Sequence, residues 1–344
     1  MKKLLFSLAI LSAIAVTAQV GINTDEPKAM LDISAKDDQK GDLRIQDVEE
    51  EKSTQWLLIW DEKDQKVKRT NLSGIKREIL NEIRIDYIRK KQPARAGDII
   101  NKIKQCTPEN ILFDKHFGDG KHDFVYCATI VSDKVGNKEY NKTWLNLNLG
   151  AAYADINSPN FNPTVNKTGE AIHSDENLYG SLYQWQRASD GHEFRDSDTA
   201  LDQAKNWVNT GDSVGKFITG SENWVKDGSD ASGSELRLWQ AGGVNNPCPS
   251  GYHVPTIEEW DELLNVLGGG NKVWSQTKLP NLAAAGFHRY VDGLLYYKGS
   301  RGYYWSSSAS DSSYARYMYF RSSYSGTNGI NRRAYGYSVR CIEN

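Results

Sequence analysis

Four cysteines place the tightest limit on what this 344-residue chain can fold into. They are Cys106, Cys127, Cys248 and Cys341, and four cysteines allow three disulfide pairings. The sequence has no close C-x-x-C pair of the kind that zinc sites use. We favour a local bridge between Cys106 and Cys127 and a long-range bridge between Cys248 and Cys341. A bridge that closes so long a loop would contribute about 4 kcal/mol in the chain-entropy model.

The first 18 residues have the pattern of a secretory signal peptide. Lys2 and Lys3 precede an apolar run over 4–16, and Val16-Thr17-Ala18 supplies small residues for cleavage. The alternative, a membrane anchor, needs about 20 apolar residues. No cysteine stands at the cleavage site. We therefore expect residues 1–18 to be removed, and the protein to be secreted or at the cell surface, not membrane-spanning and not a lipoprotein.

The charge balance excludes one class of partner. The chain has 42 Lys and Arg against 44 Asp and Glu, with a formal net charge of −2. A nucleic-acid-binding surface would require a basic excess, so we expect no nucleic-acid partner. Ordinary charge content together with 10 Trp and 18 Tyr is typical of a folded protein.

The N-terminal part of the chain has two patterns. Residues 19–72 hold short apolar runs between polar turns, which predicts a small β-rich stem. Over 73–96, Ile75, Ile79 and Ile83 recur four apart after a Ser73 N-cap, which predicts an amphipathic helix and a linker. This apolar stripe either packs on its own domain or forms a homo-oligomer seam together with the stem. Periodicity cannot separate these alternatives.

Residues 97–344 are expected to form the main domain, mostly of short β-strands separated by Gly and Ser. Two helices are predicted within it. One spans Leu178–Ala188, where aromatic residues recur at helical spacing. The other begins with a capping box of Thr256 and Glu259 and ends at the glycines of 268–270.

Several sequence blocks in this domain occur in a familiar order. They are Trp144–Gly150, Leu178–Trp185, Pro247–Pro255, Glu258–Trp260, Ala285–Phe287, Gly302–Ser308 and Tyr337–Cys341. Together they resemble the Fibrobacter succinogenes major paralogous domain over roughly 120–344. The resemblance implies an α+β, C-type-lectin-like fold with two helices and short, irregular antiparallel strands. It also supports the Cys248–Cys341 bridge, since each cysteine lies in a shared block, and it places Trp185, Trp260 and Trp305 in the core.

Catalysis finds little support in the sequence. The six histidines are scattered, and His253 is expected to make a structural hydrogen bond. Cys248 could act as a nucleophile, but a cysteine with a partner at Cys341 is expected to be oxidised in an exported chain. We therefore expect no enzymatic activity and no cofactor.

The sequence also gives little support for a metal site. The Glu-Pro-Asn and Gln-Pro-Asp loops of calcium-dependent lectins are missing from the sequence. Two groups of acids could still offer oxygens to Ca²⁺: Asp227, Asp230 and Glu235, and Asp190, Glu193, Asp196 and Asp198. We expect these to be solvated loop residues, and we predict no metal site.

The most informative feature is a polar-aromatic C-terminal stretch, with eleven of the 18 tyrosines between Tyr290 and Tyr337. Strand alternation puts Met318 and Phe320 in the core and places Tyr317, Tyr319, Arg321 and Ser323 on the other, exposed face. The predicted ligand-binding patch consists of Tyr314, Tyr317, Tyr319, Arg321, Ser323, Tyr324, Asn328, Asn331, Arg333 and Tyr335. Tyrosine with small polar residues is typical of binding surfaces. The alternative is a tyrosine-rich β surface without a ligand.

These features predict an exported, non-enzymatic, adhesin- or receptor-like protein that recognises a protein or glycan on a cell or particle. Residues 304–341 resemble the variable repeats of diversity-generating retroelements, and the alternative is a fixed paralogous domain. The segment 20–33 resembles, more weakly, the stem of surface and fibre-like proteins of Gram-negative bacteria. A structural or tip subunit of a surface fibre is therefore the alternative function.

Overall fold

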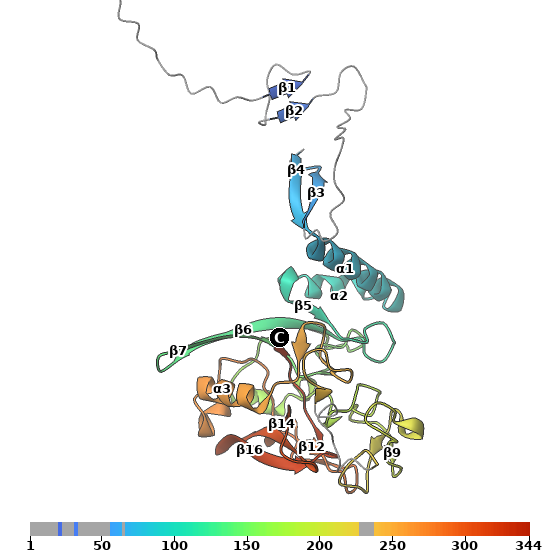
Figure 1. Ribbon diagram of the computed structural model, residues 1–344, viewed down its shortest axis with the longest axis vertical. Coiled ribbons are helices and arrows are strands. Elements are labelled where there is room, and N and C mark those ends of the chain that lie inside the picture. The colour runs from blue at the N-terminus through green and yellow to red at the C-terminus, as the bar shows by residue number, and fades with distance from the viewer. Residues whose placement is uncertain (1–19, 23–30, 34–55, 64–65, 227–236) are drawn as a thin grey trace, which may run out of the picture. The chain divides into compact units, whose positions relative to one another are not determined.

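The structure is a computed structural model that describes residues 20–22, 31–33, 56–63, 66–226 and 237–344. The chain divides into two compact units, Met1–Ile75 and Lys76–Asn344 (Figure 1). The predicted signal peptide, residues 1–18, lies outside the described residues. In the first unit the strands are β1 (Val20–Ile22), parallel to β2 (Leu31–Ile33), and β3 (Trp56–Asp61), antiparallel to β4 (Lys66–Asn71).

The second unit is built mainly from short antiparallel strands in three sheets. The first sheet has the order β11 (Tyr252–His253), β18 (Ile342–Glu343), β7 (Lys138–Leu145), β6 (Val125–Val135), β5 (Ile111–Phe113). The second has the order β13 (Leu295–Tyr296), β12 (Phe287–His288), β17 (Gly336–Tyr337), β8 (Tyr183–Gln184). The third consists of β14 (Arg301–Ala309), β15 (Tyr314–Arg321) and β16 (Tyr324–Arg332). A short parallel pair joins β9 (Thr199–Ala200) to β10 (Phe217–Ile218).

Three α-helices occur in the described part of the chain: α1 (Leu72–Lys91), α2 (Ala96–Ile103) and α3 (Ile257–Leu267). None of these helices combines the length and apolar character needed to cross a membrane. Helix α1 packs through Ile88, which is fully buried in a small core with residues of α2, β5 and β6. Ile83, from the predicted apolar stripe, is instead 62% exposed. The side chains of Ile75 and Ile79 lie outside the described residues.

Helix α3 is the predicted capped helix. The Thr256 hydroxyl accepts a hydrogen bond from the Glu259 backbone N–H, and the Glu259 carboxylate accepts one from the Thr256 N–H. Gly268 ends the helix at φ 94°, a left-handed conformation that glycine adopts without strain. The buried face of α3 packs on Met318 and Phe320 of β15, both fully buried. Trp185, Trp260 and Trp305 are also fully buried, so their assignment to the core is confirmed.

The predicted helix over Leu178–Ala188 is wrong. The chain there forms one 3₁₀ turn (Glu176–Leu178) and then strand β8. Gly180 breaks the segment at φ 69°, and a Cβ at this position would lie 2.4 Å from the Leu149 carbonyl oxygen. Residues 178–187 are buried without interruption, on every side of the segment, so the spacing of the aromatic residues does not mark one face of a helix.

The expected fold class is therefore wrong as well. Strands account for more of the chain than helices do, and the sheets are curled and antiparallel. The domain is mostly β, with three described α-helices, and it is not the two-helix α+β domain of C-type-lectin-like type that the resemblance implied.

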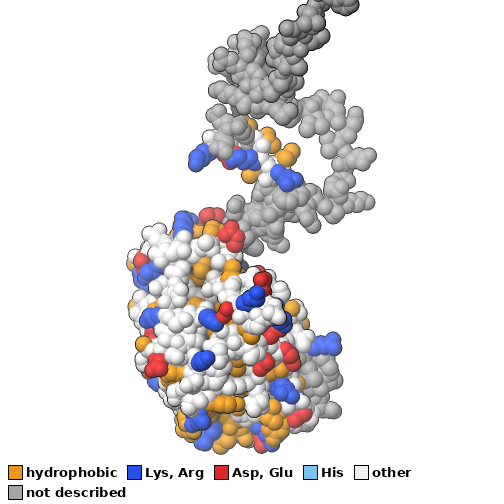
Figure 2. All heavy atoms as spheres, turned by 90° about the vertical axis from the view of Figure 1, so that its left-hand side faces the viewer, with side chains coloured by type: hydrophobic (Ala, Val, Ile, Leu, Met, Phe, Trp, Pro, Cys, Tyr) orange, Lys and Arg blue, Asp and Glu red, His pale blue; other side chains and the backbone are white. Residues whose placement is uncertain are grey.

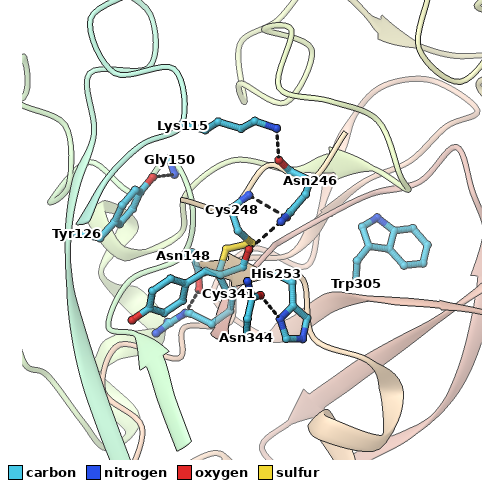
Figure 3. Close-up of a disulfide and its surroundings, with 12 residues drawn as sticks. Lys115, Tyr126, Asn148, Gly150, Asn246, Cys248, His253, Trp305, Cys341 and Asn344 are labelled. Atoms are coloured by element: carbon cyan, nitrogen blue, oxygen red, sulfur yellow. Dashed lines mark hydrogen bonds between the residues drawn. A yellow bond between two sulfur atoms is a disulfide. The ribbon is translucent and has the colours of Figure 1, made fainter. Parts of the chain in front are cut away.

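Both predicted disulfides are confirmed. Cys106–Cys127 joins the chain after α2 to β6, and Cys248–Cys341 joins the residues before β11 to the residues before β18 (Figure 3). The Asn246 side chain orders the second bridge, since it accepts from the Cys248 N–H at 3.1 Å and donates to the Tyr252 carbonyl at 2.7 Å. Two disulfides are consistent with an extracellular protein.

The capping box gives a small, local test of the fold. Replacing Thr256 with alanine should lower the free energy of unfolding by about 1 kcal/mol, because the Glu259 backbone N–H loses its acceptor. Chemical denaturation would measure this loss. Thr256→Ser is the control and should stay close to wild type, since the hydroxyl is kept; equal losses in both variants would contradict the role of the cap.

Candidate functional site

The third sheet presents one surface that carries most of the predicted binding residues, and we call it the tyrosine face. Strand register sets it out in three rows across β16, β15 and β14. The rows are Tyr324–Arg321–Arg301, then Gly326–Tyr319–Tyr303, then Gly329–Tyr317–Trp305. The opposite face carries Met318 and Phe320, as predicted.

The first row is the open end of the tyrosine face. Tyr324 is 41% exposed, Arg321 is exposed and Arg301 is partly exposed. The row continues beyond β14 to Tyr297, whose ring is 45% exposed and lies 3.7 Å from the Arg301 guanidinium carbon. Ser323 is exposed in the β15–β16 turn beside this row. Figure 2 shows hydrophobic side chains, tyrosines included, concentrated at the lower end of the domain, where Figure 1 places β14 and β16.

The third row is covered by the domain itself. The Tyr317 ring lies 5.0 Å from that of Tyr337 and 6.1 Å from that of Trp305, both fully buried. Burial raises the pKa of Tyr317 to about 12. Gly329 makes room for this ring, because a Cβ there would stand 2.5 Å from it. Tyr317 therefore contributes to the fold, and its predicted place on an exposed binding surface is wrong.

Four predicted patch residues lie away from the open end. Tyr314 and Asn331 are at the far end of the sheet, about 23 Å along β15 by strand geometry. Asn331 donates to the Tyr337 hydroxyl at 2.5 Å, and the Tyr335 ring packs 5.0 Å from Tyr290. Arg333 is fully buried, 4.7 Å above the Trp185 ring. Its placement on the surface was wrong because β16 ends at residue 332 and the chain then turns inward.

The structure also adds two residues that the sequence did not indicate. Arg301 and Tyr297 flank a turn before β14, between two of the sequence blocks that the family shares. Tyr297 adopts φ 57°, a left-handed conformation that is costly for an aromatic residue. The signal that could have identified Arg301 is the composition of the sheet: β14–β16 contain Arg301, Arg316, Arg321 and Arg332 but no acidic residue.

A second cluster of polar groups is buried elsewhere in the domain. His122 lies between two carboxylates, with Nδ1 2.6 Å from Asp119 Oδ2 and Nε2 2.8 Å from Glu193 Oε1. Burial alone would lower the pKa of His122, but the hydrogen bonds and charges of Glu193 and Asp119 raise it to about 9. Glu193 is fully buried; burial would raise its pKa, but His122 and His192 hold it at about 2. His122 and Glu193 thus form an ion pair at neutral pH.

Asp190, His192 and Glu193 are the one group in the described residues whose donor atoms lie close enough to hold a metal ion. All three donors are already occupied. Arg187 donates to Asp190 at 2.8 Å, His192 Nδ1 lies 2.8 Å from Asp190, and Glu193 pairs with His122. A metal ion would have to displace Arg187 from Asp190 and His122 from Glu193. The three side chains therefore fit a structural network of ion pairs better than a metal site.

The other acids considered for calcium are not grouped. Asp196 and Asp198 are exposed and separate from this network. Asp227, Asp230 and Glu235 lie outside the described residues.

The overall features therefore define a disulfide-bonded, mostly β domain with a tyrosine- and arginine-lined surface at one end. The chain belongs to the Fibrobacter succinogenes major domain family, whose family model matches residues 139–343. This confirms the resemblance of the sequence blocks. No curated protein and no solved structure matches the chain.

Proposed function

We propose that the protein is an exported, non-enzymatic binding protein that recognises a glycan or a protein on a cell or particle surface. The open end of the tyrosine face is the binding site in this proposal. The observation that carries it is the first row with Tyr297: Tyr324, Arg321 and Arg301 lie side by side on paired strands, and the Tyr297 ring packs on Arg301. Tyrosine and arginine are the residues enriched at binding hot spots.

The scaffold suits this role. The site is built on regular strands above a core that two disulfides hold together. A rigid site loses little conformational entropy when it binds. Cys248, the nucleophile considered from sequence, is bonded to Cys341, which supports the non-enzymatic proposal.

The test is retention of the purified protein on target cells. The double variant Arg321→Ala/Tyr324→Ala removes one cross-strand pair from the open end. We expect each truncation to cost about 2 kcal/mol or more of binding free energy. The melting temperature should stay near that of wild type, since both side chains are exposed.

The matched control is Arg316→Ala/Ile330→Ala, a cross-strand pair from the same two strands. It lies on the opposite face, so retention should be unchanged. The proposal fails if both double variants are retained like wild type, or if wild type itself is not retained. Chelation with EDTA should leave retention intact, because no metal is required.

A fibre subunit is the second candidate function, and one observation favours it. On one face of the β3–β4 hairpin, Leu58, Trp60 and Val67 are 75%, 60% and 59% exposed. An isolated two-stranded hairpin with such a face is marginally stable in water. Sedimentation velocity over a concentration series separates the candidates: a fibre subunit should polymerise, whereas a receptor-like protein should stop at a small oligomer.

A further inference from the structure

Two arginines lie opposite each other at the open end of the tyrosine face, and neither has a counter-ion among the described residues. Arg301 and Arg321 are directly opposite in the β14–β15 register. Like charges in this position repel and weaken a sheet. In the described part of the chain no carboxylate lies within ion-pair distance of either residue, whereas Arg332 and Arg289 are paired with Glu222 and Asp292. The Tyr303 side chain hydrogen-bonds to Arg301 and raises its pKa, so Arg301 stays charged, but no carboxylate among the described residues neutralises either arginine.

Arg301 is also held in place before any ligand arrives. The Arg301 guanidinium stacks on the Tyr297 ring at 3.7 Å, and Tyr297 adopts a left-handed conformation in this turn. The neighbouring cation, Lys298, is paired with Glu176 at 2.7 Å. A guanidinium binds a carboxylate or sulfate through two parallel hydrogen bonds, so Arg301, with the exposed Arg321 opposite it, can form a receptor for such groups.

We propose that the ligand is an acidic polysaccharide, and that Arg301 and Arg321 together bind its carboxylate or sulfate groups. This inference rests on the proposed function and names its ligand class. The rings of Tyr297 and Tyr324, on either side of the arginines, contact the sugar rings.

A polysaccharide fits this surface better than an acidic peptide does. A peptide that joins a sheet pairs with the backbone of an edge strand, whereas the row of Tyr324, Arg321 and Arg301 runs across the strands on the face of the sheet. The exposed groups around the arginines are hydroxyls and amides, including Ser323 and Asn328, and the exposed aliphatic residue of β16, Ile330, lies on the other face. Hydroxyl and amide groups match the polar rim of a sugar.

Binding of size-matched, labelled probes tests the proposal: polygalacturonate for carboxylate, dextran sulfate for sulfate, neutral dextran and poly-glutamate. Wild type should bind at least one anionic polysaccharide about tenfold or more tightly than dextran and poly-glutamate. Binding should weaken as ionic strength rises. The two anionic probes show which group is preferred.

The variants locate the anion. Arg321→Gln and Arg301→Gln should each weaken binding about tenfold or more. Arg321→Lys should fall between Arg321→Gln and wild type, since the charge stays but the two-pronged geometry is lost. Arg316→Gln, an arginine from the other face of β15, is the control and should bind like wild type. Arg321 is exposed, so its variants remain informative even if Arg301→Gln fails to fold.

Two outcomes would overturn the inference. Equal binding of poly-glutamate would make the partner an acidic polypeptide, and equal binding of neutral dextran would remove the role of the anion. If wild type is retained on target cells through Tyr324 but Arg301→Gln and Arg321→Gln are retained equally, the inference fails while the proposed function stands. Absence of cell retention by wild type would instead remove the proposed function itself.

Discussion

Replacing Arg340 with methionine is expected to lower the free energy of unfolding by about 5 kcal/mol or more. Arg340 is fully buried, and it donates to Asn148 Oδ1 at 3.0 Å and to the carbonyl oxygens of Leu145 at 2.8 Å and Asn281 at 2.7 Å. Methionine fills similar volume but leaves these acceptors without a donor, and each buried unsatisfied group costs about 1–3 kcal/mol. Urea denaturation measures the loss.

The control for this change is Arg332→Met. Arg332 forms a surface ion pair with Glu222, at 27% and 51% side-chain exposure, and such pairs contribute about 1 kcal/mol or less. If Arg340→Met lost no more stability than Arg332→Met, then Arg340 would not organise the interior as its contacts indicate.

The second large effect is expected at His122. Replacing it with glutamine should cost about 3–5 kcal/mol at neutral pH, because the buried Glu193 carboxylate would lose its closer histidine and keep only His192, 3.2 Å away. Thermal and chemical unfolding at pH 7 measure the change. His116→Gln is the matched control: its ring lies 5.4 Å from that of His122 and is partly exposed, and a small loss is expected there.

The same ion pair sets a pH dependence. The pKa of His122 is raised to about 9, so the stability it contributes is complete below its ordinary pKa of about 6.5 and is lost as pH rises through about 9. The stability difference between wild type and His122→Gln should therefore shrink between these pH values. A difference that stays constant up to pH 10 would show that His122 is not charged in the folded protein.

Local sequence signals predicted the parts of the fold that local chemistry determines. The capping box of Thr256 and Glu259 fixes the start of α3. Alternation along β15 correctly placed Met318 and Phe320 in the core. In both cases the information lies within a few residues of the feature. The disulfides are different: Cys106–Cys127 was favoured as a local bridge among three possible pairings, and Cys248–Cys341 was supported by the family resemblance.

The errors arise where distant parts of the chain meet. The segment over 178–188 looked helical because its aromatic residues recur at helical spacing, whereas its strand partners, Gly336 and Tyr337, lie more than 100 residues further along the chain. Arg333 looked exposed because alternation was extended past the end of β16. His122 gave no sequence signal at all, since Glu193 is 71 residues further along.

The candidate site was predicted only in part, because it too combines residues from separate parts of the chain. Arg321 and Tyr324 follow from alternation and the turn between them, and they are opposite each other in the sheet. Arg301 lies beside Arg321 only because β14 pairs with β15, and Tyr297 reaches Arg301 only because of the turn before β14. Periodicity in one strand cannot show which residues a neighbouring strand brings alongside.

The disulfides also determine how the domain would respond to mechanical load. They close loops of 21 and 93 residues, and at about 3.5 Å per extended residue these loops withhold roughly 400 Å of chain from stretching. Arg321 and Tyr324 lie inside the larger loop, 20 and 17 residues before Cys341. If the sheet were pulled apart through these residues, the 20 residues between Arg321 and the Cys248–Cys341 bridge would limit the extension between Arg321 and Cys341 to about 70 Å.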